Sequence, residues 1–507
     1  MRFLFKALLV FFTTFVALLL LHAPLLRLPY FWDEAGYYIP AALDFYRWWS
    51  LIPKTTLPVG HPPLVMIYLG LAWRLFGYSA WAARAAMTLV AAATVTALYV
   101  LGRRIASREI AAWSALLLAL SPLFFAQSTL AHLDLTAALF TTLAVMFLLG
   151  GQIWLFALAA SLAVLSKETS VVLLPVAWLH AWRRGRGTAA GLPAPLPTWA
   201  ALVAPLVPLA AWALYYHHVT GYWTGNREYL SYNLYSTLSP ARVFWSLLRR
   251  AYELFIGGFN WLLTFCAPVG LWWGRKHSKL DAARVAEGPP WRPFIFLTVG
   301  LVTIYLLLLS LVGGAILPRY LLPVLPLFYL VAAALVMRLP HFPARLILAA
   351  AAACFVLAWY INPPYPFPFE DNLAYADFIR LHEQATHFLE AQPGQPRILT
   401  AWPATDELSK SFLGYVRRPL RITPVQGFAP QEFADVPPES FDLLYLYSRR
   451  WEPPGNWVVR FPAWLRVQGR YFDYHPQVAA EVLVAQYHLR LLAEMEHRGQ
   501  WVRIYSR

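Results

Sequence analysis

The feature that most constrains the fold of this chain is a series of apolar runs, each close to the length that crosses a bilayer. A spanning helix needs about 20 apolar residues. Hydrophobic residues make up 59% of the chain and charged residues only 13%, a balance unlike that of ordinary soluble proteins. The sequence therefore predicts a polytopic α-helical membrane protein, and eleven runs fit as spans, near 7–29, 79–102, 110–128, 133–150, 153–167, 169–183, 198–217, 254–274, 292–313, 319–338 and 344–361.

The first run also resembles the apolar core of a secretory signal. The residues after it make a poor cleavage site, and further apolar runs follow. We therefore expect a retained helix, with a cleaved signal as the alternative. Both cysteines, Cys266 and Cys354, lie in apolar runs, so we expect no disulfide framework.

Charge is divided unevenly along the chain. Residues 1–361 carry 26 Lys and Arg against 10 Asp and Glu, whereas residues 362–507 carry 15 against 16, so the net charge of +15 belongs to the apolar part. With a cytoplasmic N-terminus, the basic clusters fall inside, as the positive-inside rule requires. Most acids of the apolar part then fall outside. The excess of basic residues therefore indicates loop orientation and attraction to anionic lipid, and not binding to nucleic acid.

Residues 362–507 lose the long apolar runs and are predicted to form a soluble α/β domain outside the membrane. A helical period covers 372–392, and strand patterns cover 397–402, 441–448 and 500–507. The proline-rich stretch NPPYPFPFED is a stiff connector at the boundary. We therefore expect two parts, a membrane module at 1–361 with its first outer loop at 30–78, and an extracytoplasmic domain at 362–507.

Two adjacent acids, Asp33 and Glu34, follow the first apolar run in the stretch PYFWDEAGYYIP. A charged group at a membrane is costly, so function is its default explanation. The alternative, a pair of solvated loop acids, is disfavoured by the aromatic residues around them. The next stretch, 37–49, has the pattern of an amphipathic helix lying in the membrane interface.

Further polar candidates fall on the same predicted outer side. His61 follows Gly60 in a proline-rich turn, and a ligand role and a plain loop role are equally open for it. Asp134 opens a helical run just after His132, where its alternative role is to complement the helix dipole. Lys167 lies in the turn LSKETS, whose alternative role is a simple membrane-edge turn.

Two more sites add cations to this side. Arg227 lies in the outer loop TGNREYLSYN, and Arg319 and Tyr320 begin the run near 319–338. Snorkelling to the interface is the alternative for Arg319, and a cationic site for a phosphate is the sharper hypothesis. A carboxylate can deprotonate an acceptor, while cations stabilise charge on a departing phosphate. The combination suits sugar transfer from a lipid phosphate that the membrane delivers.

The motifs FWDEAGYY, GHPPL, LDLTAALF, LSKET and LPRYLLPVLPLFYL resemble, in that order, those of GT-C glycosyltransferases of the protein O-mannosyltransferase and aminoarabinose transferase type. The resemblance covers roughly residues 1–361. It implies a polyprenyl-phosphate-sugar donor, an acceptor that is a protein, lipid or glycan, and an inverting single displacement at the outer face of a bacterial cytoplasmic membrane.

The resemblance also implies roles for residues. Asp33 is the implied catalytic carboxylate with Glu34 beside it, Asp134 matches the second acidic motif, and Lys167 and Arg319 are candidates for lipid-phosphate contacts. His61, Arg227 and Tyr320 complete the predicted substrate contacts. Aminoarabinose transferases commonly carry an acidic residue and a lysine where this chain has Gly60 and His61, which leaves the sugar open.

A divalent cation is a further possibility, because oxygen and nitrogen ligands are mixed among Asp33, Glu34, His61 and Asp134. Members of the group need not use a metal, so no cofactor is firmly expected. The rival function is a transporter or flippase of a lipid-linked sugar. Transporters tend to carry charged or helix-breaking residues deep in spans and paired halves, whereas the acids here cluster at one face and no internal repeat is visible.

Overall fold

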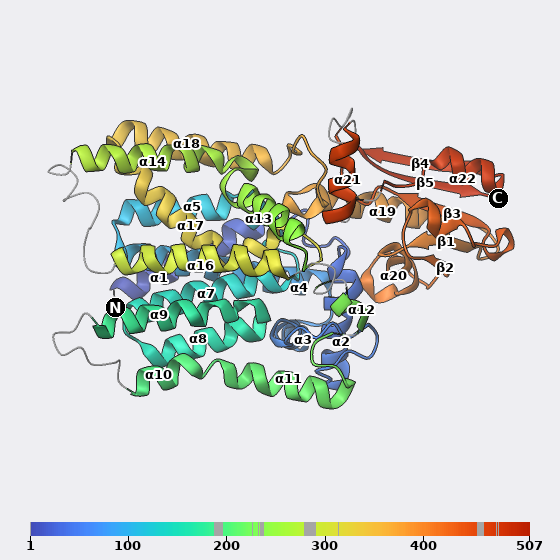
Figure 1. The fold of residues 1–507 in the computed structure, drawn as a ribbon. Coiled ribbons are helices and arrows are strands. Elements are labelled where there is room, and N and C mark those ends of the chain that lie inside the picture. The colour runs from blue at the N-terminus through green and yellow to red at the C-terminus, as the bar shows by residue number, and fades with distance from the viewer. Residues whose placement is uncertain are drawn as a thin grey trace.

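The computed structural model describes residues 2–186, 196–225, 227–231, 233, 238–277, 291–312, 314–453, 461–472, 474 and 476–507. Figure 1 shows a bundle of roughly parallel helices, with a small β-sheet unit at one end and the N-terminus near the other. The longer helices are α1 (Arg2–Leu21), α4 (Ala80–Ile105), α5 (Arg108–Leu120), α7 (Leu133–Leu149), α8 (Ile153–Ser166), α9 (Leu173–Arg186), α11 (Leu206–Thr220), α14 (Trp261–Lys276), α16 (Trp291–Leu311), α17 (Leu325–Val336) and α18 (His341–Ala358).

The predicted spans are all helical in part, but their number is not confirmed. Within the described residues, four helical segments are long and apolar enough to cross a membrane, namely Ala80–Ile105, Pro197–Thr220, Trp291–Leu311 and His341–Ala358. The second of these joins α10 (Leu196–Val203) to α11. Shorter apolar helices fill other predicted runs. The fold is thus a helical membrane type, whereas the count of eleven spans stays a prediction.

Shorter elements gather between the long helices, and several of them carry the polar candidates. Serine caps begin two of the long helices, since Ser79 accepts a hydrogen bond from the Ala82 N–H and Ser107 accepts one from the Ile110 N–H. The short elements are η1 (Glu34–Tyr38), α2 (Ile39–Trp48), α3 (Leu64–Phe76), α6 (Pro122–Gln127), η2 (Glu168–Val172), α12 (Arg227–Leu230), α13 (Pro240–Phe255), η4 (Gly257–Phe259) and η5 (Pro318–Leu321).

The predicted first outer loop is more ordered than expected. The sequence predicts an interfacial helix at 37–49, and α2 is indeed helical but is buried from Ile39 to Phe45. Asp44 lies inside and accepts hydrogen bonds from the Lys54 and Thr55 N–H groups. The apolar helix α3 follows, where the sequence analysis expected loop. This segment is therefore packed against the bundle, because its aromatic side chains bury more area in the protein than at a surface.

The last part of the chain forms a five-stranded sheet in the order β2-β1-β3-β5-β4. The central strand β3 (Leu443–Tyr447) pairs in parallel with β1 (Arg397–Ala401) and antiparallel with β5 (Gln500–Ser506). The expected helix and three expected strands are confirmed by α19 (Ala374–Glu390), β1, β3 and β5. The two edge strands, β2 (Arg421–Val425) and β4 (Arg490–His497), were not predicted. Three short helices complete this part, namely α20 (Ala404–Ser409), α21 (Pro462–Tyr471) and α22 (Ala480–Tyr487).

The sheet unit contacts the bundle through defined hydrogen bonds. The Tyr415 hydroxyl donates to the Tyr30 carbonyl at 3.1 Å, and the Tyr78 hydroxyl donates to the Phe412 carbonyl at 2.6 Å. The connector is attached as well, through η6 (Phe369–Asp371), whose Glu370 carbonyl accepts a hydrogen bond from the Gln127 side chain. These contacts hold the sheet unit over the end of the bundle where the short elements gather (Figure 1).

Candidate active site

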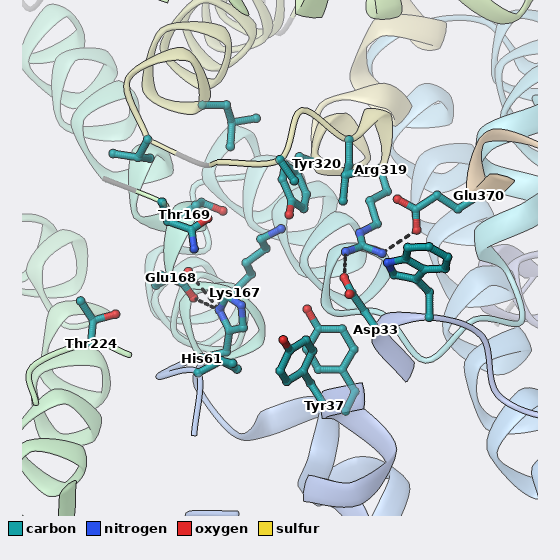
Figure 2. A pocket seen from close by; sticks show the side chains of 18 of the residues that line it. Asp33, Tyr37, His61, Lys167, Glu168, Thr169, Thr224, Arg319, Tyr320 and Glu370 are labelled. Carbon is teal, nitrogen blue, oxygen red and sulfur yellow. Dashed lines mark hydrogen bonds and ion pairs between the residues drawn. The ribbon is translucent and has the colours of Figure 1, made fainter. Parts of the chain in front are cut away.

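A cavity of about 880 Å³ opens where the bundle meets the sheet unit. Its walls come from the first loop, the turn after α8, the turn before α17, the connector and the sheet unit. Figure 2 shows polar side chains from these segments pointing into one space. Five of the predicted site residues line it, namely Asp33, His61, Lys167, Arg319 and Tyr320.

Asp33 and Arg319 form the central ion pair of this cavity. The Arg319 Nη2 group donates to the Asp33 Oδ2 atom. Arg319 is 1% exposed, whereas the Asp33 side chain keeps 20% of its surface accessible. The carboxylate is therefore the part of the pair that a substrate can reach, and the guanidinium fixes its orientation (Figure 2).

Arg319 also joins the connector to the cavity. Its Nη1 group donates to the Glu370 Oε2 atom at 2.6 Å and lies 3.1 Å from the His132 Nε2 atom. Burial raises the pKa of Glu370 to about 7, with the carboxylates of Asp33 and Asp134 adding to the rise and Arg319 opposing it. Glu370 was not predicted, because it follows the last apolar run by several residues and nothing in the sequence links it to Arg319.

Lys167 lies beside this network with its own acidic partner. Its Nζ atom donates to the Asp134 Oδ1 atom at 2.6 Å and sits 3.7 Å from the centre of the Tyr320 ring. The guanidinium groups of Arg319 and Arg250 lie 5.5 and 5.7 Å from the same ring. Three cations thus surround one tyrosine, and such a concentration of positive charge suits an anion.

Arg250 was missed by the sequence analysis. It is fully buried on α13, where its Nε atom donates to the Leu309 carbonyl. Both of its terminal nitrogens lack hydrogen-bond partners among the described residues. Buried donors are normally paired, so Arg250 is an unusual buried cation next to the site, although it does not line the cavity. The signal in the sequence was that Arg250 is the third arginine of α13, a helix that we had not predicted.

His61 and Glu168 form a second pair in the cavity wall. The His61 Nδ1 atom lies 3.0 Å from the Glu168 Oε2 atom. Burial alone would raise the pKa of Glu168, but His61 and Lys167 outweigh burial and lower it to about 2. Gly60 makes the turn before His61 with φ +78°, and a Cβ there would lie 2.3 Å from the Gly225 nitrogen. Only glycine fits this close approach.

The sheet unit supplies the remaining wall. Trp402, which directly follows β1, lines the cavity together with Arg449. The Trp402 ring lies 5.5 Å from the Trp32 ring and 5.7 Å from the Tyr37 ring. Trp402 lies in the turn between β1 and α20, and it also faces the cavity.

The structure places Glu34 away from the cavity. Its carboxylate is 0% exposed and accepts hydrogen bonds from the Phe31 and Ala131 N–H groups, 3.5 Å from the Arg84 Nη2 atom. Burial raises the pKa of Glu34, and Arg84 opposes the rise. In this position Glu34 ties the first loop to the start of α7. The prediction had both acids side by side in the site, and the helical turn of η1 separates them.

Two other predicted residues also lie outside the cavity lining. Asp134 is buried behind it and reaches the site through Lys167 and, at 3.7 Å, through the Arg319 Nε atom. Arg227 is exposed on α12, and although Thr224 and Leu230 of the same segment line the cavity, Arg227 does not. The structure therefore joins Asp134 to the candidate site and leaves Arg227 apart.

The suggested metal ligands do not converge. Among the described residues, no group of three or more His, Cys, Asp and Glu side chains is arranged to hold a metal ion. Asp33 binds Arg319, Asp134 binds Lys167, and His61 binds Glu168. Each member of the suggested set thus already has a partner of its own, so the proposal below uses no metal.

Comparison with known proteins finds similarity both in sequence and in fold. Residues 60–215 match the profile of the family described as "Dolichyl-phosphate-mannose-protein mannosyltransferase". Two crystal structures of ArnT from Cupriavidus metallidurans share the fold at 15% identity, each alignment covering 99% of this chain and 97% of that one. The TM-score is 0.55 for the structure bound to undecaprenyl phosphate and 0.51 for the apo structure. A search of proteins with curated function gives no match.

The chain shares its fold with the ArnT structures. The resemblance to GT-C proteins of the mannosyltransferase and ArnT type, first indicated by the ordered motifs, is confirmed by the family match over residues 60–215 and by the shared fold.

Proposed function

We propose that this protein transfers a single sugar from a polyprenyl-phosphate donor to an acceptor on the outer face of the cytoplasmic membrane, with inversion at the sugar carbon. The observation that carries the proposal is the cavity of about 880 Å³ in which the accessible carboxylate of Asp33 faces the cations Lys167 and Arg319. The ArnT structure with undecaprenyl phosphate bound supports the choice of a polyprenyl-phosphate donor.

Asp33 is the proposed catalytic base. An acceptor hydroxyl beside its Oδ atoms would lose its proton to the carboxylate as the oxygen attacks the anomeric carbon. The bond from that carbon to the phosphate oxygen breaks on the opposite side, and the phosphate leaves with the electron pair. A positioned carboxylate typically contributes a factor of about 10² to 10⁴ to such a step.

The cations around Tyr320 are the proposed phosphate site. Lys167, Arg250 and Arg319 all lie against this ring, and charge that develops on a leaving phosphate is stabilised most by donors fixed in advance. Arg319 holds Asp33 in the structure.

The Trp32, Tyr37 and Trp402 rings are the proposed sugar and acceptor platform. They line one side of the cavity, away from Lys167. Trp402 approaches closely because Gly36 has no side chain, since a Cβ there would lie 2.7 Å from the indole. Aromatic faces bind the apolar faces of sugar rings well. In this arrangement the sheet unit, Trp402 included, closes the site above the membrane.

Mass spectrometry of the lipid that copurifies with the protein tests the proposal most directly. We expect a polyprenyl phosphate carrying one sugar in the wild type and in Asp33→Asn, because the base does not hold the phosphate. The paired variant Asp134→Leu with Lys167→Met removes a buried charge pair without leaving a lone charge, and it should lose the lipid.

A turnover assay then separates transfer from transport. Wild-type protein in detergent, supplied with the copurified lipid and a candidate acceptor, should release free polyprenyl phosphate, and Asp33→Asn should not. Movement of intact lipid-linked sugar across vesicles, at equal rates in the wild type and Asp33→Asn, would instead identify a flippase and overturn the proposal.

A further inference from the structure

Two buried polar side chains contact the Arg319 network without lining the large cavity. His132 directly precedes α7 and Gln127 ends α6, and both are 0% exposed. Neither is among the residues that line the cavity. A buried amide or imidazole is costly unless its polar atoms are hydrogen-bonded, so the partners of these two side chains account for their position.

The hydrogen bonds of Gln127 fix which nitrogen of His132 carries the proton. The Gln127 Nε2 group donates to the Glu370 carbonyl at 3.1 Å, so the Oε1 atom of the same amide is turned to His132. This oxygen can only accept, and it lies 2.7 Å from the His132 Nδ1 atom, so Nδ1 carries the proton and donates. The lone pair is then on Nε2, which accepts from the Arg319 Nη1 group at 3.1 Å, whereas Nδ1 lies farther from that group, at 3.4 Å.

His132 therefore meets the Arg319 guanidinium as a neutral acceptor. Burial lowers the pKa of His132 well below its ordinary value, and the charge of Arg319 adds to the fall. The ring thus stays uncharged beside the cation. A neutral acceptor fixes the direction of the guanidinium and adds no negative charge, so Arg319 keeps its full attraction for the Asp33 carboxylate.

Gln127 and His132 together determine how the Arg319 guanidinium is turned. Its Nη1 group is bound by His132 and by the Glu370 Oε2 atom at 2.6 Å, whereas its Nη2 group donates to Asp33 (Figure 2). Because a guanidinium is planar and rigid, fixing Nη1 also fixes the direction of Nη2. Gln127 binds both His132 and the Glu370 backbone, so one amide ties together the two partners of Nη1.

We propose that His132 and Gln127 are positioning residues that orient Arg319, and through Arg319 the Asp33 carboxylate, for sugar transfer. This inference rests on the function proposed above, in which Asp33 is the base. Neither positioning residue lines the cavity, so their loss should lower kcat and not weaken donor binding. A displacement of about 1 Å at the reacting groups can cost about 10²-fold in rate, whereas KM for the donor should stay within about threefold.

A pair of substitutions at His132 separates orientation from packing. The amide oxygen of His132→Gln can take the place of Nε2 and accept from Arg319, whereas the shorter side chain of His132→Asn can reach only Gln127. We expect His132→Asn to lower kcat by about 10- to 100-fold and His132→Gln to lower it by less than about threefold. Initial rates of sugar transfer over a range of donor concentrations, per amount of folded protein, measure kcat and KM.

A double-variant cycle tests whether the two residues act as one unit. Gln127→Met keeps the bulk of the side chain and removes both hydrogen bonds of the amide, so we expect it to lower kcat as well. Gln127→Met combined with His132→Asn should lose little more than His132→Asn alone, because both changes act through Arg319. Independent, additive losses in this cycle would contradict the proposed relay.

His22→Asn is the matched control for a buried histidine. His22 is also 0% exposed, its ring nitrogens lie 2.8 and 2.9 Å from the Leu18 and Phe125 carbonyls, and it does not line the cavity. We expect His22→Asn to lower the melting temperature, because buried hydrogen bonds are lost. The kcat of the folded protein should be unchanged.

The outcomes that overturn the proposal are distinct from one another. A wild-type kcat in His132→Asn overturns the positioning role, and so do equal losses in His132→Asn and His132→Gln, because equal losses would show a packing role only. A rise in donor KM without a fall in kcat also overturns it. If the wild type itself transfers no sugar, the proposed function fails and this inference fails with it, so the wild-type assay tells the two failures apart.

Discussion

The two neighbouring acids of the first loop occupy opposite kinds of surroundings. Asp33 reaches a large cavity, keeps part of its surface accessible and pairs with an arginine from a distant turn. Glu34 is fully enclosed, with two backbone donors and Arg84 around its carboxylate. The difference shows that two adjacent acids can have separate roles. The Asp33 carboxylate stays accessible in the cavity, whereas the Glu34 carboxylate holds in place the loop that carries Asp33.

Removal of the Asp33 charge should give the largest effect on activity. We expect Asp33→Asn to lower kcat by about 10²- to 10⁴-fold, because the general base is lost. Thermal unfolding should change little, since Arg319 retains Glu370 as a partner. Initial rates of sugar transfer together with a melting curve measure both effects. Turnover at the wild-type rate would show that Asp33 is not the base.

The Glu34→Gln variant should show the reverse pattern. Loss of this carboxylate leaves the Arg84 guanidinium buried without an acidic partner, and breaking a buried pair in this way costs about 3 to 5 kcal/mol. We expect the free energy of unfolding to fall by that order, and kcat of the folded fraction to stay within about threefold. Denaturant titration in detergent measures the first quantity. An unchanged stability with a collapsed kcat would place Glu34 in the chemistry after all.

Glu370 of the connector pairs with Arg319, the partner of Asp33, and gives a pH-dependent test of this network. Burial raises the pKa of Glu370 to about 7 from its ordinary value of 4.5, so the folded state binds more protons than the unfolded state between these values. Stability is therefore fully present below about pH 4.5 and declines as the pH rises to about 7, by roughly 3 kcal/mol. Melting temperatures across this range measure the slope.

Glu370→Gln is the matched variant for this slope, since it removes the titrating group and keeps the shape. We expect a flatter stability profile between pH 4.5 and 7. Glu439→Gln, a change at an exposed acid of the sheet unit, should leave the slope as in the wild type. A slope that persists in Glu370→Gln would assign the titration to another group.

The smallest effect should come from Arg227, which the sequence placed among the substrate contacts. Its side chain is exposed and does not line the cavity. We expect Arg227→Ala to change stability by less than about 0.5 kcal/mol and kcat/KM by less than about twofold. A steady-state assay alongside Asp33→Asn checks this. A tenfold loss would mean that α12 moves over the cavity during the reaction.

Much of the fold could be predicted because apolar runs and helical periods are local signals. The helices at 80–105, 291–311 and 341–358 follow directly from them. The edge strands β2 and β4 escaped because they are largely exposed, so their side chains carry little apolar alternation. The helices α3 and α13 escaped because their 13 and 16 residues fall short of the length of a spanning helix.

The residues of the candidate site also fall into those that the sequence could predict and those that it could not. Asp33, His61, Lys167, Arg319 and Tyr320 lie in motifs of unusual polar residues next to apolar runs, so they could be found in advance. Glu370 and Arg250 could not, because each is an ordinary residue in its own segment and gains its place from contacts with segments far away in the chain.

The sequence by itself determined the apolar helical character of residues 1–361, the concentration of basic residues in that part and the pair of acids from which the cavity takes one, because hydropathy and charge act residue by residue. Only the tertiary structure decided which carboxylate is sealed against Arg84 and which cations converge on Tyr320. The physical reason is that burial and pairing depend on neighbours in space. Asp33 precedes η1 and Glu34 begins it, so two neighbours in sequence meet different surroundings, one at the cavity and one against Arg84.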